Sequence, residues 1–78
     1  EFSVTPNPSQ WIFRLNLPSD VKTIESVVIQ DLSGRQVYQL YGDFSVEKTY
    51  NTTLPTGTYM LITNTNKGQF VEKIQILN

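Results

Sequence analysis

The stretch from Leu54 to Ile62 constrains the fold of this 78-residue chain more than any other segment. Pro55 has no backbone N–H, so the chain cannot be in the middle of a sheet ladder at that residue. Gly57 permits the positive φ that a tight corner often requires. The unbroken apolar run Tyr59-Met60-Leu61-Ile62 then predicts a central strand that is covered on both faces. The stretch therefore predicts a sharp corner that leads into a buried β-strand.

Tyr59 can be interpreted in two ways. Its ring can be buried while its hydroxyl returns to the backbone of the preceding loop, as in the tyrosine corner of immunoglobulin-like sandwiches. An ordinary hairpin turn accounts for the same residues equally well. Both interpretations favour a β-sandwich, and neither indicates an enzyme.

The composition indicates one small domain that spans residues 1–78, with residues 1–2 as a linker or a cloning remnant. The chain has no Cys, so it forms no disulfide, and without His or Cys it lacks the usual zinc ligands. Six basic and seven acidic residues are scattered along it, which does not favour nucleic acid or an anionic membrane surface as a partner. No apolar run approaches the length of about 20 residues that a membrane span needs.

The hydrophobic pattern predicts β-strands throughout. Apolar residues alternate in segments separated by Pro, Gly, Asn and Ser, and no segment has a period of 3.6 residues. The expected strands are residues 2–5, 11–17, 27–32, 35–40, 44–50, 59–63 and 69–77. We therefore predict an all-β fold, a small antiparallel immunoglobulin-like β-sandwich of about seven strands.

Four features of the strands are specific enough to test. The segment 11–17 should place Trp11, Phe13, Leu15 and Leu17 on its buried face. Val27-Val28-Ile29 should be buried on both faces. In the segment 69–77, Phe70, Ile74 and Ile76 should face one side and Val71, Lys73 and Leu77 the other. Lys48, on the apolar face of the segment 44–50, predicts a short or edge strand.

Three turns or breaks should separate these strands. Ser33-Gly34 predicts a hairpin turn in which Asp31 and Ser33 accept bonds from turn amides and Gly34 takes a positive φ. Tyr41-Gly42-Asp43 predicts a break between two strands. Residues 64–68 predict a polar loop.

The residues that catalysis would require are largely missing. Without His and Cys, the common nucleophilic triads are excluded. The remaining carboxylates Asp31, Asp43 and Glu47 fall in separate turns and strands, where we expect them to be solvated. The segment 31–34 offers too few oxygen ligands for calcium. We therefore expect no catalytic residue, no metal site and no cofactor.

Three ordered motifs give the chain a family resemblance. They are Thr5-Pro6-Asn7-Pro8, the segment Val27-x-Ile29-x-Asp31-Leu32-Ser33-Gly34-Arg35-x-Val37, and Leu54-Pro55-x-Gly57-x-Tyr59 followed by a terminal Lys73-Ile74-x-Ile76. In that order and spacing the chain resembles the C-terminal sorting domain of type IX secretion cargo in Bacteroidetes. The corner motif alone also resembles fibronectin type III and carboxypeptidase-regulatory-like modules.

The resemblance implies a secretion signal without catalytic activity. Such a domain follows an N-terminal cargo domain and directs it through the periplasm and the outer-membrane translocon to the cell surface or the exterior. A sortase-like cysteine proteinase then removes it, at a point upstream of this chain or at its very start. The implied recognition residues are Pro6, Asn7, Pro8, Gly34, Gly57, Tyr59, Lys73, Ile74, Gln75, Ile76 and Leu77.

A terminal strand with an accessible edge can add to the sheet of a partner. We therefore expect residues 73–78 to dock on a translocon component, and the same edge allows paired dimers. Two alternatives remain open at this point. A carbohydrate-binding module predicts a cluster of exposed aromatic side chains, whereas a structural spacer predicts further residues after Asn78.

Overall fold

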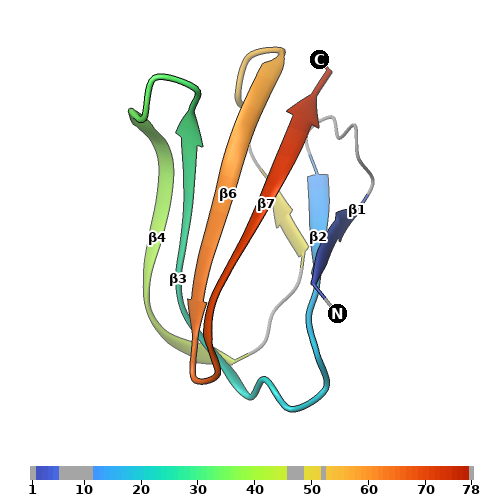
Figure 1. Cartoon of the computed structure of the whole chain (residues 1–78), viewed down its shortest axis with the longest axis vertical. Helices are drawn as coiled ribbons and strands as arrows, with labels where there is room; N and C mark the ends of the chain where they lie inside the picture. Colours follow the sequence, from blue (N-terminus) through green and yellow to red (C-terminus); the bar gives the residue numbers. More distant parts are fainter. Residues whose placement is uncertain (1, 6–11, 46–48, 52, 78) are drawn as a thin grey trace.

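The computed structural model describes residues 2–5, 12–45, 49–51 and 53–77, which form two facing antiparallel β-sheets (Figure 1). The strands are β1 (Ser3–Thr5), β2 (Ile12–Asn16), β3 (Thr23–Asp31), β4 (Gln36–Ser45), β5 (Thr49–Asn51), β6 (Gly57–Thr65) and β7 (Gly68–Ile76). The smaller sheet has the order β1-β2-β5 and the larger sheet the order β4-β3-β6-β7. The predicted all-β antiparallel sandwich is confirmed. In the described residues, no helix is long and apolar enough to cross a membrane.

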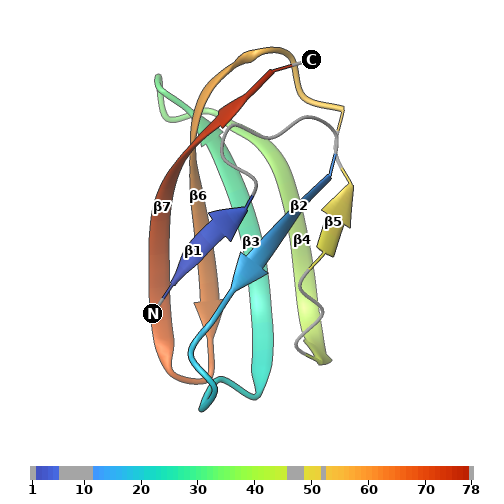
Figure 2. The ribbon, with the colours of Figure 1, turned by 90° about the vertical axis from the view of Figure 1, so that its right-hand side faces the viewer.

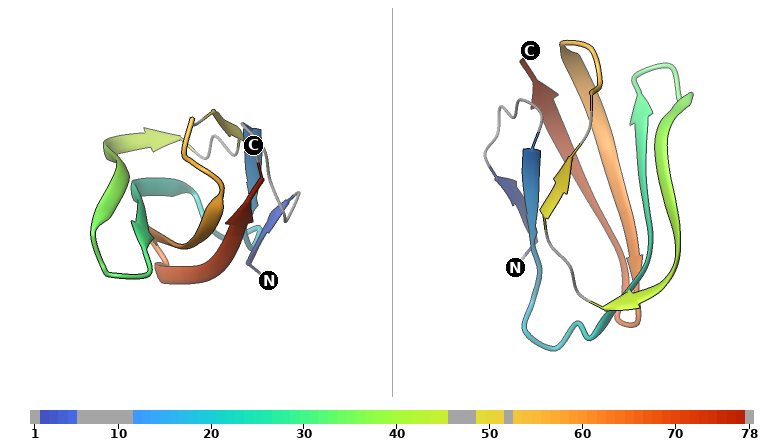
Figure 3. Two further views of the ribbon diagram at one scale, coloured as in Figure 1. Left: turned by 90° about the horizontal axis from the view of Figure 1, so that it is seen from above. Right: turned by 180° about the vertical axis from the view of Figure 1, so that it is seen from behind.

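The hydrophobic core lies between the two sheets, which face each other in Figures 2 and 3. Both sheets supply side chains that are at most 8% exposed. They are Val4, Phe13 and Leu15 from the smaller sheet, Ile24, Val27, Ile29, Tyr59, Leu61, Ile74 and Ile76 from the larger sheet, and Leu54 from the connection before β6. Because the chain has no disulfide, burial of this apolar surface is the main stabilising term.

Strand β2 confirms the alternation predicted for its segment. Phe13 and Leu15 are completely buried, Arg14 is exposed, and Leu17 packs against the core just after the strand. Trp11, the other residue predicted for this buried face, lies outside the described residues.

Strand β3 starts earlier than predicted and contains a β-bulge. The bulge lies at Glu25, where the register with both neighbouring strands shifts. Ile24 and Val27 are both fully buried although they are three residues apart, and the bulge restores the phase between them. Val28 is 7% exposed, so the prediction that Val27-Val28-Ile29 is buried on both faces is confirmed.

The predicted break at Tyr41-Gly42-Asp43 is wrong, because β4 continues through it to Ser45. Between Tyr41 and Phe44 the register with β3 shifts by one residue, so the glycine marks a bulge inside the strand. The predicted strand 44–50 is also wrong as a single strand. Its first two residues end β4 in the larger sheet, and Thr49 and Tyr50 begin β5 in the smaller sheet. Lys48 lies outside the described residues.

Strand β6 is central in the larger sheet, as predicted, but its two faces are not equally covered. Tyr59 and Leu61 face the core and are buried, whereas Met60 and Ile62 are half-buried on the opposite face. The expectation of full coverage on both faces is therefore wrong for this strand. Its apolar outer residues are shielded mainly by their neighbours in the same sheet.

The two hairpins of the larger sheet use the same kind of turn. In the β3–β4 turn the Gly34 N–H donates to the Asp31 carbonyl at 3.0 Å, and Gly34 has a φ of +92°. In the β6–β7 turn Gly68 has a φ of +109°. A positive φ after a two-residue turn is typical of the bulged hairpin. The positive φ of Gly34 is confirmed, and the polar loop predicted at 64–68 is shorter than expected, because only residues 66 and 67 lie outside the strands.

Asn66 ties the β6–β7 turn to the segment that enters β3. Its side-chain Oδ1 accepts bonds from the backbone N–H groups of Lys22, at 2.8 Å, and Thr23, at 3.1 Å. Its own N–H donates to the Thr23 carbonyl at 3.3 Å. The contact joins parts of the chain more than 40 residues apart, so the turn helps to fix the lower end of the larger sheet in Figure 1.

We expect Gly34→Ala and Gly68→Ala each to lower the free energy of unfolding by about 1–2 kcal/mol, because an L-residue is strained at a positive φ. Chemical denaturation checks the magnitude. Gly34→Asn is the matched control and should cost less, since asparagine tolerates this backbone conformation. Equal losses for the alanine and asparagine variants would contradict the conformational explanation.

Candidate functional site

The register of the larger sheet brings three of the predicted motifs together at one end. Gly57 pairs with Ile76 and Tyr59 pairs with Ile74. The corner, residues 54–59, therefore lies directly beside the tail, residues 73–77. Tyr59 also pairs with Asp31 on its other side, which places the β3–β4 turn at the same end. We call this region, formed by residues 31–35, 54–59 and 73–77, the motif end. It is the upper end of the larger sheet in Figure 1 and in the right-hand view of Figure 3.

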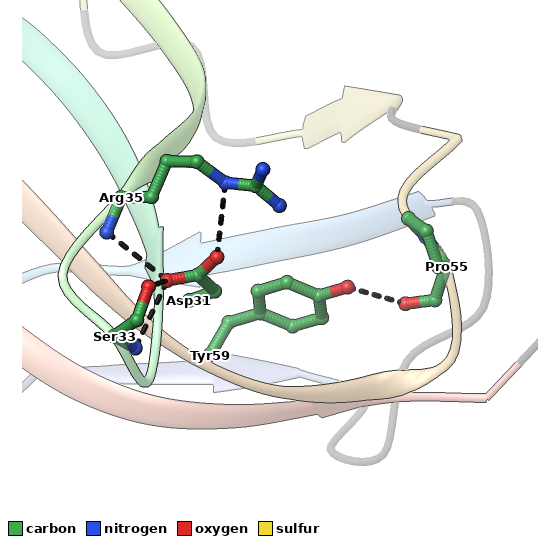
Figure 4. A network of polar contacts seen from close by, with 5 residues as sticks. All are labelled: Asp31, Ser33, Arg35, Pro55 and Tyr59. Carbon is green, nitrogen blue, oxygen red and sulfur yellow. Dashed lines mark hydrogen bonds and ion pairs between the residues drawn. The ribbon is translucent and has the colours of Figure 1, made fainter.

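The corner before β6 is held by the side chain of Tyr59. Its hydroxyl donates a 2.6 Å hydrogen bond to the carbonyl of Pro55, four residues upstream (Figure 4). The residue is only 6% exposed, so the ring is in the core while the hydroxyl reaches the loop. This geometry confirms the tyrosine-corner interpretation rather than an ordinary hairpin turn.

Gly57 does not have the positive φ that the sequence suggested, so that prediction is wrong. It is instead the first residue of β6, in a strand conformation. A Cβ built there would lie 3.5 Å from Cε2 and Oη of Tyr59. The tyrosine ring therefore packs over the glycine backbone, at a distance that ordinary van der Waals contact still permits.

The carboxylate of Asp31 organises the β3–β4 turn (Figure 4). Its Oδ1 accepts bonds from the Ser33 N–H at 3.0 Å, the Ser33 hydroxyl at 2.6 Å and the Arg35 N–H at 3.0 Å. Its Oδ2 accepts from Arg35 Nε at 3.2 Å. Asp31 thus accepts turn amides as predicted, whereas Ser33 acts as a donor. The carboxylate stabilises the turn, where the sequence placed it.

These contacts lower the pKa of Asp31 below its ordinary value of 3.8. The bond from the Ser33 hydroxyl is the largest cause, and the N–H groups of Arg35 and Ser33 and the charge of Arg35 act in the same direction. Partial desolvation opposes them. The turn is therefore built around an ionised carboxylate.

The tail is part of the core and of the motif end at once. Ile74 and Ile76 are completely buried, which confirms the predicted inner face of the segment. Lys73 and Gln75 are exposed on the other face of β7, and Leu77 is 50% exposed just beyond it. At the start of the strand, the ring of Phe70 lies 5.4 Å from that of Phe2, which attaches the first residues to the last strand.

A shallow hollow lies beside the tail. It has a volume of about 210 Å³ and is lined by Thr56, Gly57, Thr58, Gln75, Ile76 and Leu77. Residues on both sides of the Gly57–Ile76 pair therefore form its wall.

The structure does not place the other predicted site residues. Pro6, Asn7 and Pro8 lie outside the described residues, as does Glu47, and the side chain of Asp43 is not described. In the described part of the chain, no group of three potential metal ligands is present.

The recognition residues expected from the sequence did not include Leu32, Thr56 and Thr58, which belong to the motif end. Leu32 could have been found, because a leucine is unusual in an otherwise polar turn. Thr56 and Thr58 have no such signal, since they join the site only through the pairing of β6 with β7.

Comparison with protein families identifies the family of this chain. Residues 3–77 match the family model described as the secretion system C-terminal sorting domain. The match covers nearly the whole chain, including the corner, the turn and the tail. No curated protein sequence matches the chain.

We expect Tyr59→Phe to lower the free energy of unfolding by about 0.5–1.5 kcal/mol, because it removes the bond to Pro55 and keeps the buried ring. Thermal or chemical denaturation measures the loss. Gly57→Ala is the control, with an expected change of no more than about 1 kcal/mol in the stabilising direction, since alanine restricts the unfolded chain. A larger loss for Gly57→Ala than for Tyr59→Phe would contradict the contact geometry.

The Asp31 turn predicts an acid-dependent stability. Because the folded pKa is below 3.8, the stabilisation is fully present above that pH and is lost as the pH falls through the folded pKa. The carboxylate of Asp31, followed by NMR, should titrate below 3.8, and Ser33→Ala should move the midpoint upward. The stability difference between the wild type and Asp31→Asn should shrink between about pH 7 and about pH 2. An unchanged midpoint in Ser33→Ala would contradict the assigned cause.

Proposed function

Because this chain belongs to the family of secretion system C-terminal sorting domains, we propose that the type IX outer-membrane translocon recognises it in folded form. The domain is a non-catalytic sorting signal, so a protein that carries it is exported to the cell surface or the exterior. The observation that carries the proposal of folded recognition is the pairing of Gly57 with Ile76 and of Tyr59 with Asp31 and Ile74. These motif residues are far apart in the sequence, and only folding brings them to one end of the larger sheet.

The tail is the first candidate for contact with the translocon. Strand β7 is at the edge of the larger sheet, where strand addition by a partner sheet can occur. In such a complex the main chain supplies affinity and the outward side chains select the register. Lys73 and Gln75 are the outward residues of this part of β7, and Leu77 follows them.

Deleting the tail does not test this contact cleanly. The deletion removes Ile74 and Ile76, which are completely buried. Truncation of one such residue to alanine costs about 2–5 kcal/mol, a large part of the 5–15 kcal/mol that stabilises a typical domain. Loss of export after deletion could therefore follow from unfolding alone. Substitutions confined to the outward face separate recognition from stability.

Removal of the signal completes the proposed sequence. The cargo domain precedes this domain and passes with it through the periplasm, and a sortase-like cysteine proteinase then cleaves between them during attachment to the surface. This chain contains no Cys and no His, so the nucleophile of that reaction comes from the proteinase. The sorting domain is thus assigned the recognition step, and the proteinase is assigned the cleavage step.

The structure gives the carbohydrate-binding alternative little support. That alternative predicts a cluster of exposed aromatic side chains. Among the side chains that the structure describes, Tyr41 is the exposed aromatic residue, at 61%. Trp11 lies outside the described residues. We therefore give priority to the sorting signal.

The test is an export assay. The domain is fused behind a fluorescent passenger that is delivered to the periplasm of a bacterium with a type IX system. The wild-type fusion should bring the passenger to the cell surface or the medium. Lys73→Glu with Gln75→Glu should reduce the exported amount at least about tenfold, because charge reversal on the outward face opposes docking.

Gln69→Glu with Val71→Glu is the matched control, since it adds acidic residues to the same face of β7 at its other end. It should be exported nearly as well as the wild type, and melting temperatures should show that both variants are folded. A wild-type fusion that stays in the periplasm would refute the signal function. Equal export of the two variants would refute the role of the tail.

A further inference from the structure

The motif end carries a hollow whose wall includes the exposed Leu77, and a second exposed leucine, Leu32, in the β3–β4 turn at the same end of the sheet, a combination that strand addition does not use. We propose that this surface binds one apolar side chain, presented next to a carboxylate on an exposed segment of the translocon. The proposal rests on the sorting function and names the chemistry of the partner. It assigns a contact role to Leu32, Leu77 and the hollow between residues 56–58 and 75–77.

The fold does not require a leucine at position 32. Its side chain is 69% exposed, in a turn whose other members each stabilise the backbone. Asp31 and Ser33 form the side-chain bonds of the turn, and Gly34 supplies the positive φ. The position of Leu32 in such a turn accepts most residues. A polar residue would serve the fold equally well, so the leucine is available for a partner.

Leu77 and the hollow lie at the same end of the sheet. A single exposed apolar residue is common on protein surfaces, but here Leu77, at 50% exposure, is itself part of the wall of the hollow. The hollow of about 210 Å³ exceeds the roughly 150 Å³ of a cavity that binds benzene. It is therefore large enough for one leucine or phenylalanine side chain. Its mixed lining, with two threonines and a glutamine, can also accommodate the polar backbone that carries that side chain.

The net charge of the motif end favours a partner that carries an acidic residue. Arg35 and Lys73 are basic, and Asp31 is the one acidic residue among residues 31–35, 54–59 and 73–77, so this end has a formal charge of +1 in a chain whose net charge is −1. The carboxylate of Asp31 is already engaged by Ser33 and Arg35, and the Arg35 side chain is 77% exposed. Complementary charge at an interface favours encounter and selects partners. A carboxylate near the inserted side chain matches this surface.

Export of full-length fusions tests the two leucines. Leu32→Ser with Leu77→Ser should reduce the exported passenger at least about fivefold while the melting temperature stays close to that of the wild type. The matched control is Tyr41→Thr with Val71→Thr, two residues of similar exposure, 61% and 47%, that are away from the hollow. The control should be exported normally. Equal export of the two double variants would overturn the proposal.

Thr58→Phe provides an independent test, because it fills the hollow without removing apolar surface. It should reduce export to a similar extent. An increase would show that the surface acts by general hydrophobicity and would overturn the specific site. If Thr58→Phe and the double leucine variant are both exported as well as the wild-type fusion, this inference is refuted and the sorting function still stands. Failure of the wild-type fusion itself would refute the sorting function.

The charge preference is tested with two short peptides as probes, acetyl-Asp-Phe-Asp-amide and acetyl-Lys-Phe-Lys-amide. Each is titrated into the isotope-labelled domain and followed by backbone amide NMR shifts. The acidic peptide should shift residues 56–58 and 75–77 with at least about threefold higher affinity than the basic one. Equal or tighter binding of the basic peptide, or shifts centred on Tyr41 and Val71, would contradict the proposed site.

Discussion

The position of β6 between β3 and β7 is the constraint on which the other contacts depend. Its register places Tyr59 beside both Asp31 and Ile74, and the Tyr59 hydroxyl fixes the corner from which the strand starts. A slip of one residue would turn Tyr59 and Leu61 out of the core and Met60 and Ile62 into it. The tyrosine corner therefore fixes more than a local turn. It determines which residues of the tail are buried and which face outward.

This arrangement gives the tail two faces with different environments. Ile74 and Ile76 complete the core, whereas Lys73 and Gln75 face outward. A sorting signal of this kind can vary its outer residues without unfolding, because period-two alternation keeps the two sets apart. The same separation explains why substitutions on one face are more informative than removal of the strand.

Local chemistry allowed part of the fold and site to be predicted. The turn at Asp31–Gly34 depends on residues only a few positions apart, so their side-chain types were sufficient to identify it. At Tyr59 the same reasoning left a tyrosine corner and an ordinary hairpin turn equally open, and the bond to Pro55 distinguishes them. The strand wrongly predicted at 44–50 shows the limit of this reasoning. Phe44 pairs with Ile24 in one sheet and Tyr50 pairs with Phe13 in the other. Since both sheets face the same core, alternation along the chain does not reveal where it crosses between them.

The sequence by itself determined the all-β class, the hairpin turn, a sharp bend at Pro55 and the inner face of the tail, because alternation, proline and glycine act over short distances. Only the tertiary structure decided that the Tyr59 hydroxyl closes the corner onto Pro55 and that Gly57 begins a strand without a positive φ, since the sheet places the tyrosine ring. It likewise decided that Leu32, Thr56, Thr58 and Leu77 share one end. Strand register is a long-range property, set by how several segments fill one core together, and no single segment encodes it.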